Sequence, residues 1–229
     1  MAGIINSKIK RPPNKLITEF EELNTSIISD TMNRMNSMKA EIKPIIEIDR
    51  AVAGPAVTVQ CIVGDNLMIH QAMYIAQPGD ILVIDARGHK DTSVWGAIMT
   101  KACMVRGVKA VVIDGSIRDL RENREMGFPI FCLGVVPAGS QKNWGGNINV
   151  PIHCGGVEVS PGDIIVGDSD GVVVVPADIA AEVLAMAQRR VAMEAEWIKG
   201  IESGKTTLEV IGLDKKLKEL GITVDGFNK

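Results

Sequence analysis

Near the N-terminus, apolar residues recur at spacings of three and four between positions 16 and 38. Such spacing places side chains on one face of a helix. The polar run Asn24-Thr25-Ser26 interrupts the pattern with residues that are favoured where helices begin, so we expect two short helices instead of one. The apolar positions are Leu16, Phe20, Leu23, Ile27, Ile28 and Met32.

Residues 51–63 are rich in Val and Ile and predict a strand. This strand leads to Asp65 and Asn66, either of which can cap a helix over residues 67–76. Further along, Pro78-Gly79-Asp80 and Pro161-Gly162-Asp163 each precede an apolar run. Pro-Gly suits a tight turn, so we expect two strands that are entered in the same way.

Two uninterrupted apolar runs, residues 110–114 and 171–175, are typical of strands buried on both faces. Strands that alternate with helices, followed by a β-rich stretch over residues 131–175, predict a mixed α/β domain. Within this scheme, residues 87–91 are expected to form a loop, and residues 168–171 a tight turn and not a calcium loop.

The C-terminal part of the chain reads as helical. Residues 177–199 predict a long helix, and residues 206–220 an amphipathic helix that docks on this or another subunit. We expect residues 1–229 to form a single domain, with a core over about 15–178 and a helical tail over about 179–220.

Composition and charge indicate which kinds of molecule the protein binds. The formal net charge of −3 gives no basic surface for nucleic acid or for an anionic membrane, and no apolar run approaches the ~20 residues that span a bilayer. The N-terminal segment lacks the order of a signal peptide, and the four cysteines show no C-x-x-C pairing. We therefore expect a cytoplasmic protein with a small-molecule partner and reduced, packed cysteines.

The residues that could form a functional site lie at two predicted strand-to-helix junctions. Gly96 opens one predicted helix, where the unpaired amides of Ile98 and Met99 are placed to receive a carboxylate. Arg118 follows a buried strand at the other junction, and its planar fork suits a 2-oxo acid. Asp119 beside it can bind a hard cation such as Mg²⁺.

A purely structural interpretation of these residues also stands. Arg118 and Glu122 are four residues apart and can form an ion pair on a helix, and Asp119 is a favourable residue in the first turn of any helix. An R-D-x-x-E sequence alone therefore does not establish a site.

The wider pattern resembles the RraA-like family, which includes the 4-hydroxy-4-methyl-2-oxoglutarate aldolases. Gly96, the 21 residues that follow it, Arg118-Asp119 and Glu122 are similar to the signature of that family. The resemblance covers roughly residues 15–220 and includes further landmarks in order: Pro78-Gly79-Asp80, Asp114-Gly115, residues 127–131, Asn149-Val150-Pro151, Pro161-Gly162-Asp163 and residues 168–176.

This resemblance implies a swivelling β/β/α fold with N-terminal helices and a helical tail, assembled as a homotrimer or homohexamer with sites at subunit interfaces. It implies that Arg118 binds a 2-oxo acid and stabilises its enolate, and that Asp119 holds Mg²⁺ or Mn²⁺. Residues 96–99, which are Gly96, Ala97, Ile98 and Met99, would bind the substrate carboxylate.

The sequence departs from the family pattern at Ala97, where several aldolases of the family have an acidic residue. A glutamate that reaches a neighbouring site in such aldolases has two candidates here, Glu194 and Glu196. Glu122 matches the acidic position that the family's aldolases have and its regulators lack.

The resemblance therefore implies a divalent-metal-dependent class II aldolase that cleaves 4-hydroxy-2-oxo dicarboxylic acids to pyruvate, with oxaloacetate decarboxylase activity. The alternative is a non-enzymatic regulator that binds a ribonuclease. No single residue suggests itself as the general base of the aldol cleavage, and a metal-activated water is the favoured candidate for that role. His70, His89 and His153 are expected to have packing or surface roles, and Lys142 to be either an exposed lysine or a partner for a distal carboxylate.

Overall fold

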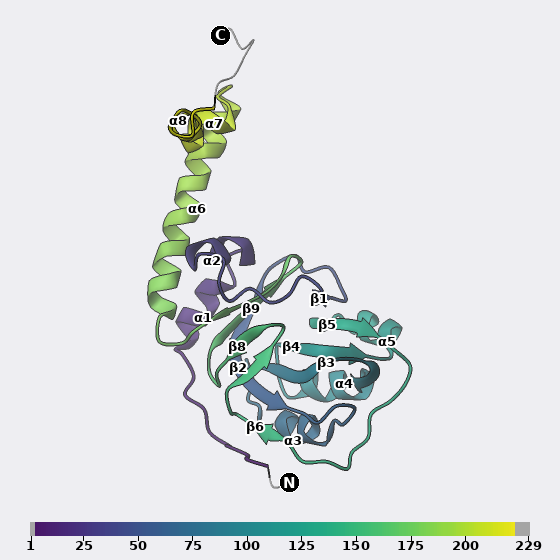
Figure 1. The fold of residues 1–229 in the computed structure, drawn as a ribbon. Helices are drawn as coiled ribbons and strands as arrows, with labels where there is room; N and C mark the ends of the chain where they lie inside the picture. Colours follow the sequence, from purple (N-terminus) through teal and green to yellow (C-terminus); the bar gives the residue numbers. More distant parts are fainter. Residues whose placement is uncertain (1–2, 223–229) are drawn as a thin grey trace. The chain divides into compact units, whose positions relative to one another are not determined.

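A computed structural model of the protein describes residues 3–222 (Figure 1). The chain divides into two compact units, Met1–Ala185 and Met186–Lys229, and the division falls within the longest helix, α6 (Ala180–Glu202). Among the described residues, no helix is both long enough and apolar enough to cross a membrane.

The first unit is built on a mixed sheet of eight strands in the order β1-β5-β4-β3-β2-β9-β10, with β6 paired to β2. The strands β2 to β5 run parallel, whereas β9 pairs antiparallel with both β2 and β10. A separate hairpin consists of β7 and β8. The bounds are β1 (Lys43–Pro44), β2 (Val52–Gln60), β3 (Ile81–Trp95), β4 (Ala110–Ile117), β5 (Ile130–Val135), β6 (Asn147–Ile148), β7 (Ile152–Cys154), β8 (Val157–Val159), β9 (Ile164–Asp168) and β10 (Gly171–Val175).

The helices of this unit form where the apolar spacing predicts them. The expected pair of N-terminal helices is confirmed, as is the helix over residues 67–76. Asp65 begins the latter by accepting the amide of Leu67 at 2.9 Å. The bounds are α1 (Asn14–Phe20), α2 (Thr25–Thr31), α3 (Leu67–Ile75), α4 (Ala97–Val105) and α5 (Leu120–Glu125).

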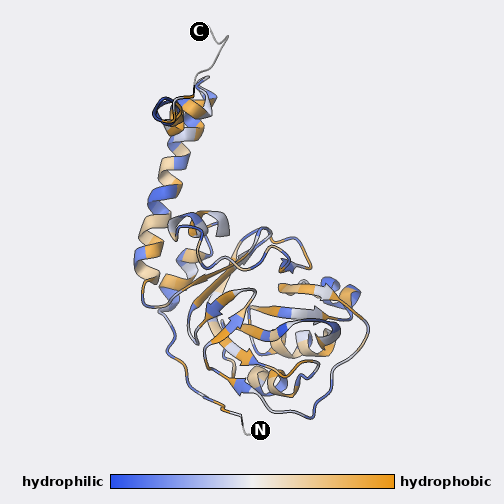
Figure 2. Ribbon diagram, viewed as in Figure 1, coloured by the Kyte–Doolittle hydropathy of each residue, from blue (hydrophilic) through white to orange (hydrophobic). Residues whose placement is uncertain are grey.

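Both faces of the central strands are buried, which explains their uninterrupted apolar sequences. One row of paired residues, Val57, Leu82, Val111 and Ile130, packs into the core that includes side chains of α3 and α4. The adjacent row faces a second core that is shared with β7, β8 and β10. Figure 2 shows the concentration of hydrophobic residues along these strands. The mixed α/β architecture expected from the sequence is confirmed.

The two Pro-Gly-Asp turns are built alike, as the sequence predicts. Gly79 and Gly162 have φ angles of 93° and 92°, a region that glycine adopts without strain. Each following aspartate accepts the backbone amide three residues before it at 2.8 Å, from Gln77 to Asp80 and from Ser160 to Asp163. The same closed turn thus leads into β3 and into β9.

Two local predictions are wrong. Residues 87–91 are not a loop but part of β3, which continues to Trp95 with shifts of register against β4 and positive φ angles at Arg87 and Gly88. Residues 206–220 form two helices, α7 (Thr207–Ile211) and α8 (Leu213–Glu219), because Gly212 adopts a φ of 77° and ends the first. The turn at residues 168–171 is confirmed as the two-residue connection between β9 and β10.

The cysteines are free and buried, as expected of packing residues. Burial raises the pKa of the Cys61 and Cys103 thiols to about 12 and that of Cys132 to about 11. Thiols with such pKa values are protonated at neutral pH and are poor nucleophiles.

Large apolar side chains are exposed on α3 and α4, among them Tyr74, Val105 and Ile98, which is 85% exposed. Exposed apolar side chains that lie close together are common where proteins associate. Assembly as a trimer or hexamer nevertheless stays a prediction.

The buried pair between Arg11 and Asp80 provides a test of the fold. Both guanidinium–carboxylate bonds are short, at 2.8 and 2.7 Å, and the Asp80 side chain is only 1% exposed. Asp80→Ala leaves Arg11 and the Gln77 amide without this acceptor, so we expect a loss of about 3 kcal/mol in the free energy of unfolding, measured in urea. Glu125→Ala, which breaks the exposed pair with Arg121, should cost less than about 1 kcal/mol. Equal losses would contradict this account of the turn.

Candidate functional site

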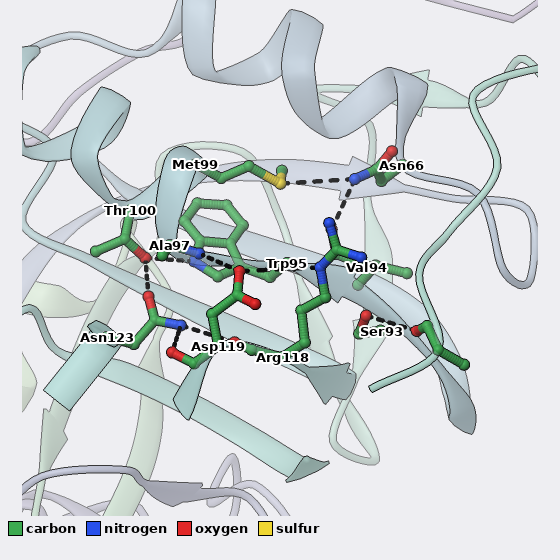
Figure 3. Close-up of polar contacts among 11 residues, drawn as sticks. Asn66, Ser93, Val94, Trp95, Ala97, Met99, Thr100, Arg118, Asp119 and Asn123 are labelled. Carbon is green, nitrogen blue, oxygen red and sulfur yellow. Dashed lines mark hydrogen bonds and ion pairs between the residues drawn. The ribbon is translucent and has the colours of Figure 1, made fainter. Parts of the chain in front are cut away.

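The two strand-to-helix junctions that the sequence singles out lie side by side. Trp95 at the end of β3 pairs with Ile117 at the end of β4, and the Arg118 amide donates to the Trp95 carbonyl at 3.0 Å. Because β3 and β4 are parallel, the starts of α4 and α5 lie at the same edge of the sheet. Gly96 and Arg118, 22 positions apart in the sequence, are thereby brought together. Figure 3 shows Arg118 and Asp119 beside Trp95 and Ala97.

Asp119 links the two junctions. Its Oδ2 atom accepts the Ala97 amide at 3.0 Å and lies 3.8 Å from Nε of Arg118. The Asp119 backbone is left-handed, with a φ of 56° and a ψ of 45°, a conformation that is uncommon for residues other than glycine. Such backbone strain is found most often at functional sites.

Gly96 is required by close approach and not by its backbone angles, since its φ of −159° is open to any residue. A Cβ atom at this position would lie 2.6 Å from Oδ2 of Asp119 and 3.4 Å from Cγ of Arg118. Any side chain here would therefore push the Asp119 carboxylate away from the start of α4.

A chain of buried hydrogen bonds holds the Arg118–Asp119 turn in place. Nε1 of Trp95 donates to the Thr100 hydroxyl at 2.8 Å, and this hydroxyl donates to Oδ1 of Asn123 at 2.6 Å. Nδ2 of Asn123 in turn donates to the backbone carbonyls of Arg118 and Asp119, at 2.8 and 2.9 Å. Thr100 and Asn123 are fully buried, so the turn is fixed from beneath. The sequence pattern does not predict this role of Asn123.

These residues line a pocket of about 230 Å³. Gly96, Ile98, Met99, Arg118 and Asp119 contribute to it, as the sequence predicts. It is also lined by residues that the sequence analysis missed or assigned to packing: Asn66, His70, Ser93, Trp95 and Ser140, together with Lys142. A larger hollow of about 640 Å³, lined by Gln60, Arg87 and Trp144 among others, contains none of the predicted site residues.

The amides at the start of α4 are only partly available to a ligand. The amide of Ala97 is bound by Asp119, and that of Met99 donates to the Gly96 carbonyl at 3.0 Å. The Ile98 amide has no such partner among the described residues. Ile98 is therefore better placed than Met99 to receive a substrate carboxylate, and Met99 lines the pocket with its side chain.

The loop that brings Lys142 to the pocket is held by several hydrogen bonds. Both the amide and the hydroxyl of Ser93 donate to the Ala138 carbonyl, at 2.8 and 2.7 Å. The Asn66 amide donates to the Gln141 carbonyl at 3.0 Å. On the other side of Lys142, the Asn143 amide donates to Oδ2 of Asp65 at 2.6 Å. The position of Lys142 is therefore set by β3 and by the start of α3.

Several predicted residues are not among those that line this pocket. Ala97 is one of them, and its amide donates to Asp119. Glu122 is exposed on α5 and is not among the lining residues. Glu194 belongs to the second unit, where it pairs with Arg190 at 2.8 Å, and Arg190 lies 4.8 Å from the centroid of the Trp197 ring. The roles of Glu122, Glu194 and Glu196 stay predictions.

The residues present suit a divalent cation bound by one carboxylate. The Asp119 side chain is 38% exposed and borders the pocket, so it can offer an oxygen to a cation. Over residues 3–222, no group of three or more His, Cys, Asp or Glu side chains is arranged to hold a metal. Such a site suits Mg²⁺, which retains several waters and needs only one or two carboxylates.

The buried support for the turn can be tested by Asn123→Leu, which keeps the branched shape of the side chain and removes every hydrogen bond of the amide. We expect a loss of about 2 kcal/mol in the free energy of unfolding, because the Thr100 hydroxyl and two backbone carbonyls lose their partner. Arg121→Leu on the exposed face of the same helix is the control, with an expected change within about 0.5 kcal/mol. Both values follow from urea denaturation, and equal stability of the two variants would show that the network does not hold the turn.

The chain matches a known protein family over most of its length. The family described as RraA-like (Aldolase/RraA) matches residues 25–174. A Halalkalibacterium halodurans protein named "Putative 4-hydroxy-4-methyl-2-oxoglutarate aldolase" is 46% identical over 174 residues, which cover 76% of this chain and 82% of that protein.

Two solved structures have the same fold. An uncharacterized protein from Pseudomonas syringae is 29% identical with a TM-score of 0.77, and the alignment covers 88% of this chain and 99% of that one. RraAS2 from Streptomyces coelicolor, described as an unusual member of the RNase ES inhibitor RraA family, is 28% identical with a TM-score of 0.73, covering 82% and 99%. The RraA-like fold expected from the sequence is thus confirmed.

Proposed function

Because the chain belongs to the RraA-like family, we propose that it is a divalent-metal-dependent class II aldolase that releases pyruvate from 4-hydroxy-2-oxo dicarboxylic acids. Substrates such as 4-hydroxy-4-methyl-2-oxoglutarate fit this proposal, and oxaloacetate decarboxylation is expected at the same site. The observation that supports it most strongly is the meeting of Arg118 and Asp119 with the start of α4 in one pocket. The 46% identical relative bears the name of such an aldolase.

In this proposal the 2-oxo acid end of the substrate lies against Arg118 and the start of α4. The Ile98 amide receives the carboxylate, while the Arg118 guanidinium, 49% exposed at the pocket, donates to the 2-oxo oxygen. When the bond between C3 and C4 breaks, negative charge develops on that oxygen. Arg118 then forms stronger hydrogen bonds than it did with the uncharged ketone, which lowers the barrier.

Asp119 would hold Mg²⁺ or Mn²⁺, and the ion would act as a Lewis acid on the 2-oxo group when bound. The chain itself fixes the carboxylate for this purpose through the Ala97 amide and through the Asn123 bonds to the turn. A site whose groups are already held in place needs little reorganisation during the reaction.

The proposal is tested by pyruvate release from 4-hydroxy-4-methyl-2-oxoglutarate and from oxaloacetate after treatment with EDTA, with and without Mg²⁺ or Mn²⁺. We expect activity that returns with metal, and a loss of about 100-fold to 1000-fold in kcat in Arg118→Ala and Asp119→Ala. Arg121→Ala, on the exposed side of α5, should leave activity unchanged.

Spontaneous, metal-dependent decay of oxaloacetate must be subtracted. Absence of turnover above that background with either substrate would rule out the proposed activity. It would favour the alternative, a non-enzymatic regulator that binds a ribonuclease, because the similar RraAS2 structure comes from a family of ribonuclease inhibitors. Binding to a ribonuclease would then be the next measurement.

Lys142 is the residue that we assign to the distal carboxylate of a dicarboxylic substrate. It lines the pocket on a fastened loop, opposite in charge to that group. A hydrogen bond to a charged group contributes about 1.5–3 kcal/mol, so Lys142→Met should raise KM for dicarboxylic substrates by roughly 10-fold to 100-fold and change kcat much less. Lys39→Met, at an exposed position away from the pocket, is the matched control. An unchanged KM would remove Lys142 from substrate binding.

A further inference from the structure

Two residues that line the pocket, Asn66 and His70, each have a buried side-chain atom without a hydrogen-bond partner among the described residues, Oδ1 of Asn66 and Nε2 of His70. A buried polar atom that lacks a hydrogen-bond partner destabilises the fold by about 1–3 kcal/mol. On a residue that lines a pocket, such an atom indicates that a ligand group supplies the missing hydrogen bond. Asn66 and His70 lie one helical turn apart at the start of α3, where the His70 amide donates to the Asn66 carbonyl at 3.3 Å. Both atoms therefore belong to one wall of the pocket.

The orientation of the Asn66 amide shows what kind of ligand group fits this wall. Nδ2 of Asn66 donates to the Val94 carbonyl at 3.1 Å, which directs the acceptor Oδ1 away from that bond. Oδ1 can only accept a hydrogen bond, so it favours a hydroxyl group and disfavours a carboxylate or ketone oxygen. In a 4-hydroxy-2-oxo acid, the C4 hydroxyl is such a donor.

His70 is suited to accept a proton at the same place. Burial, and secondly the charge of Lys142, lowers the pKa of the His70 imidazole, so the ring is neutral at neutral pH. The charged residues that line the pocket with it are Arg118 and Lys142, which are cations, and Asp119, which is an anion. A neutral imidazole on a residue that lines the pocket, with a ring nitrogen that has no hydrogen-bond partner among the described residues, has the properties of a general base.

We propose that His70 is the general base of aldol cleavage, an inference that rests on the proposed function. Nε2 of His70 takes the proton of the C4 hydroxyl, and the electrons of that O–H bond form the new C4 carbonyl. The bond between C3 and C4 breaks, and its electron pair forms the enolate of pyruvate, whose oxygen faces Arg118. The imidazolium of His70 then returns the proton to C3, which becomes the methyl group of pyruvate.

The two reactions expected at this site differ in their need for this base. In oxaloacetate, C4 is a carboxylate that leaves as carbon dioxide, so there is no hydroxyl proton to remove, and the enolate can be protonated by solvent. Both reactions depend equally on Arg118. Removal of His70 should therefore separate them.

The test is His70→Gln, which retains a polar side chain of similar size and has no basic nitrogen. We expect aldol cleavage of 4-hydroxy-4-methyl-2-oxoglutarate to fall by roughly 100-fold to 10,000-fold in kcat, while decarboxylation of oxaloacetate keeps most of its rate. Calorimetric binding of oxalate, which mimics the enolate and needs only the Arg118 end of the pocket, should be unchanged. His153→Gln, an exposed position on β7, is the control.

Three outcomes would overturn the role of His70. If the wild-type protein is active and the His70→Gln variant still cleaves the hydroxylated substrate, another group is the general base. Equal losses of both reactions, or a loss of oxalate binding, make His70 a structural residue of the pocket. A wild-type protein that turns over neither substrate overturns the proposed function itself, and with it the base.

Discussion

The parallel pairing of β3 with β4 is the constraint on which the site depends. Parallel strands end at the same edge of a sheet, so the helices that follow them begin there together. The starts of α4 and α5 thus approach so closely that Gly96 has no room for a side chain and the Asp119 carboxylate reaches the Ala97 amide. The apolar segments of both strands pack into the two cores on either face of the sheet.

Features set by local sequence could be predicted. The apolar rows that fill both faces of the sheet appear in the sequence as uninterrupted Val and Ile runs, and the paired Pro-Gly-Asp turns appear as two copies of one short pattern. The placement of Arg118 and Asp119 at a strand-to-helix junction could also be predicted, since both follow a buried strand directly. The specific fold was predicted from the resemblance to a family, because the spacing of apolar residues alone predicts only a mixed α/β domain.

Other features depend on contacts between distant segments and gave no local signal. Asn123 looks like an ordinary residue of a short helix until Thr100, on another helix, is seen to complete its hydrogen bonds. His70 fits an amphipathic helix equally well as a packing residue, and only the unpartnered Nε2 in the pocket distinguishes it. A spacing of four from Asn66 was the one available clue. The break at Gly212 was missed because the leucine and isoleucine spacing continues across it.

The left-handed backbone of Asp119 limits how this position can change during evolution. Aspartate and asparagine tolerate that conformation better than other residues with side chains, because a short polar group can bond locally. Glutamate would preserve the charge but fit the backbone poorly, and glycine would relieve the backbone but remove the carboxylate. Conformation and charge thus restrict this residue together. The amino acids that satisfy both requirements form a narrower set than the charge alone would allow.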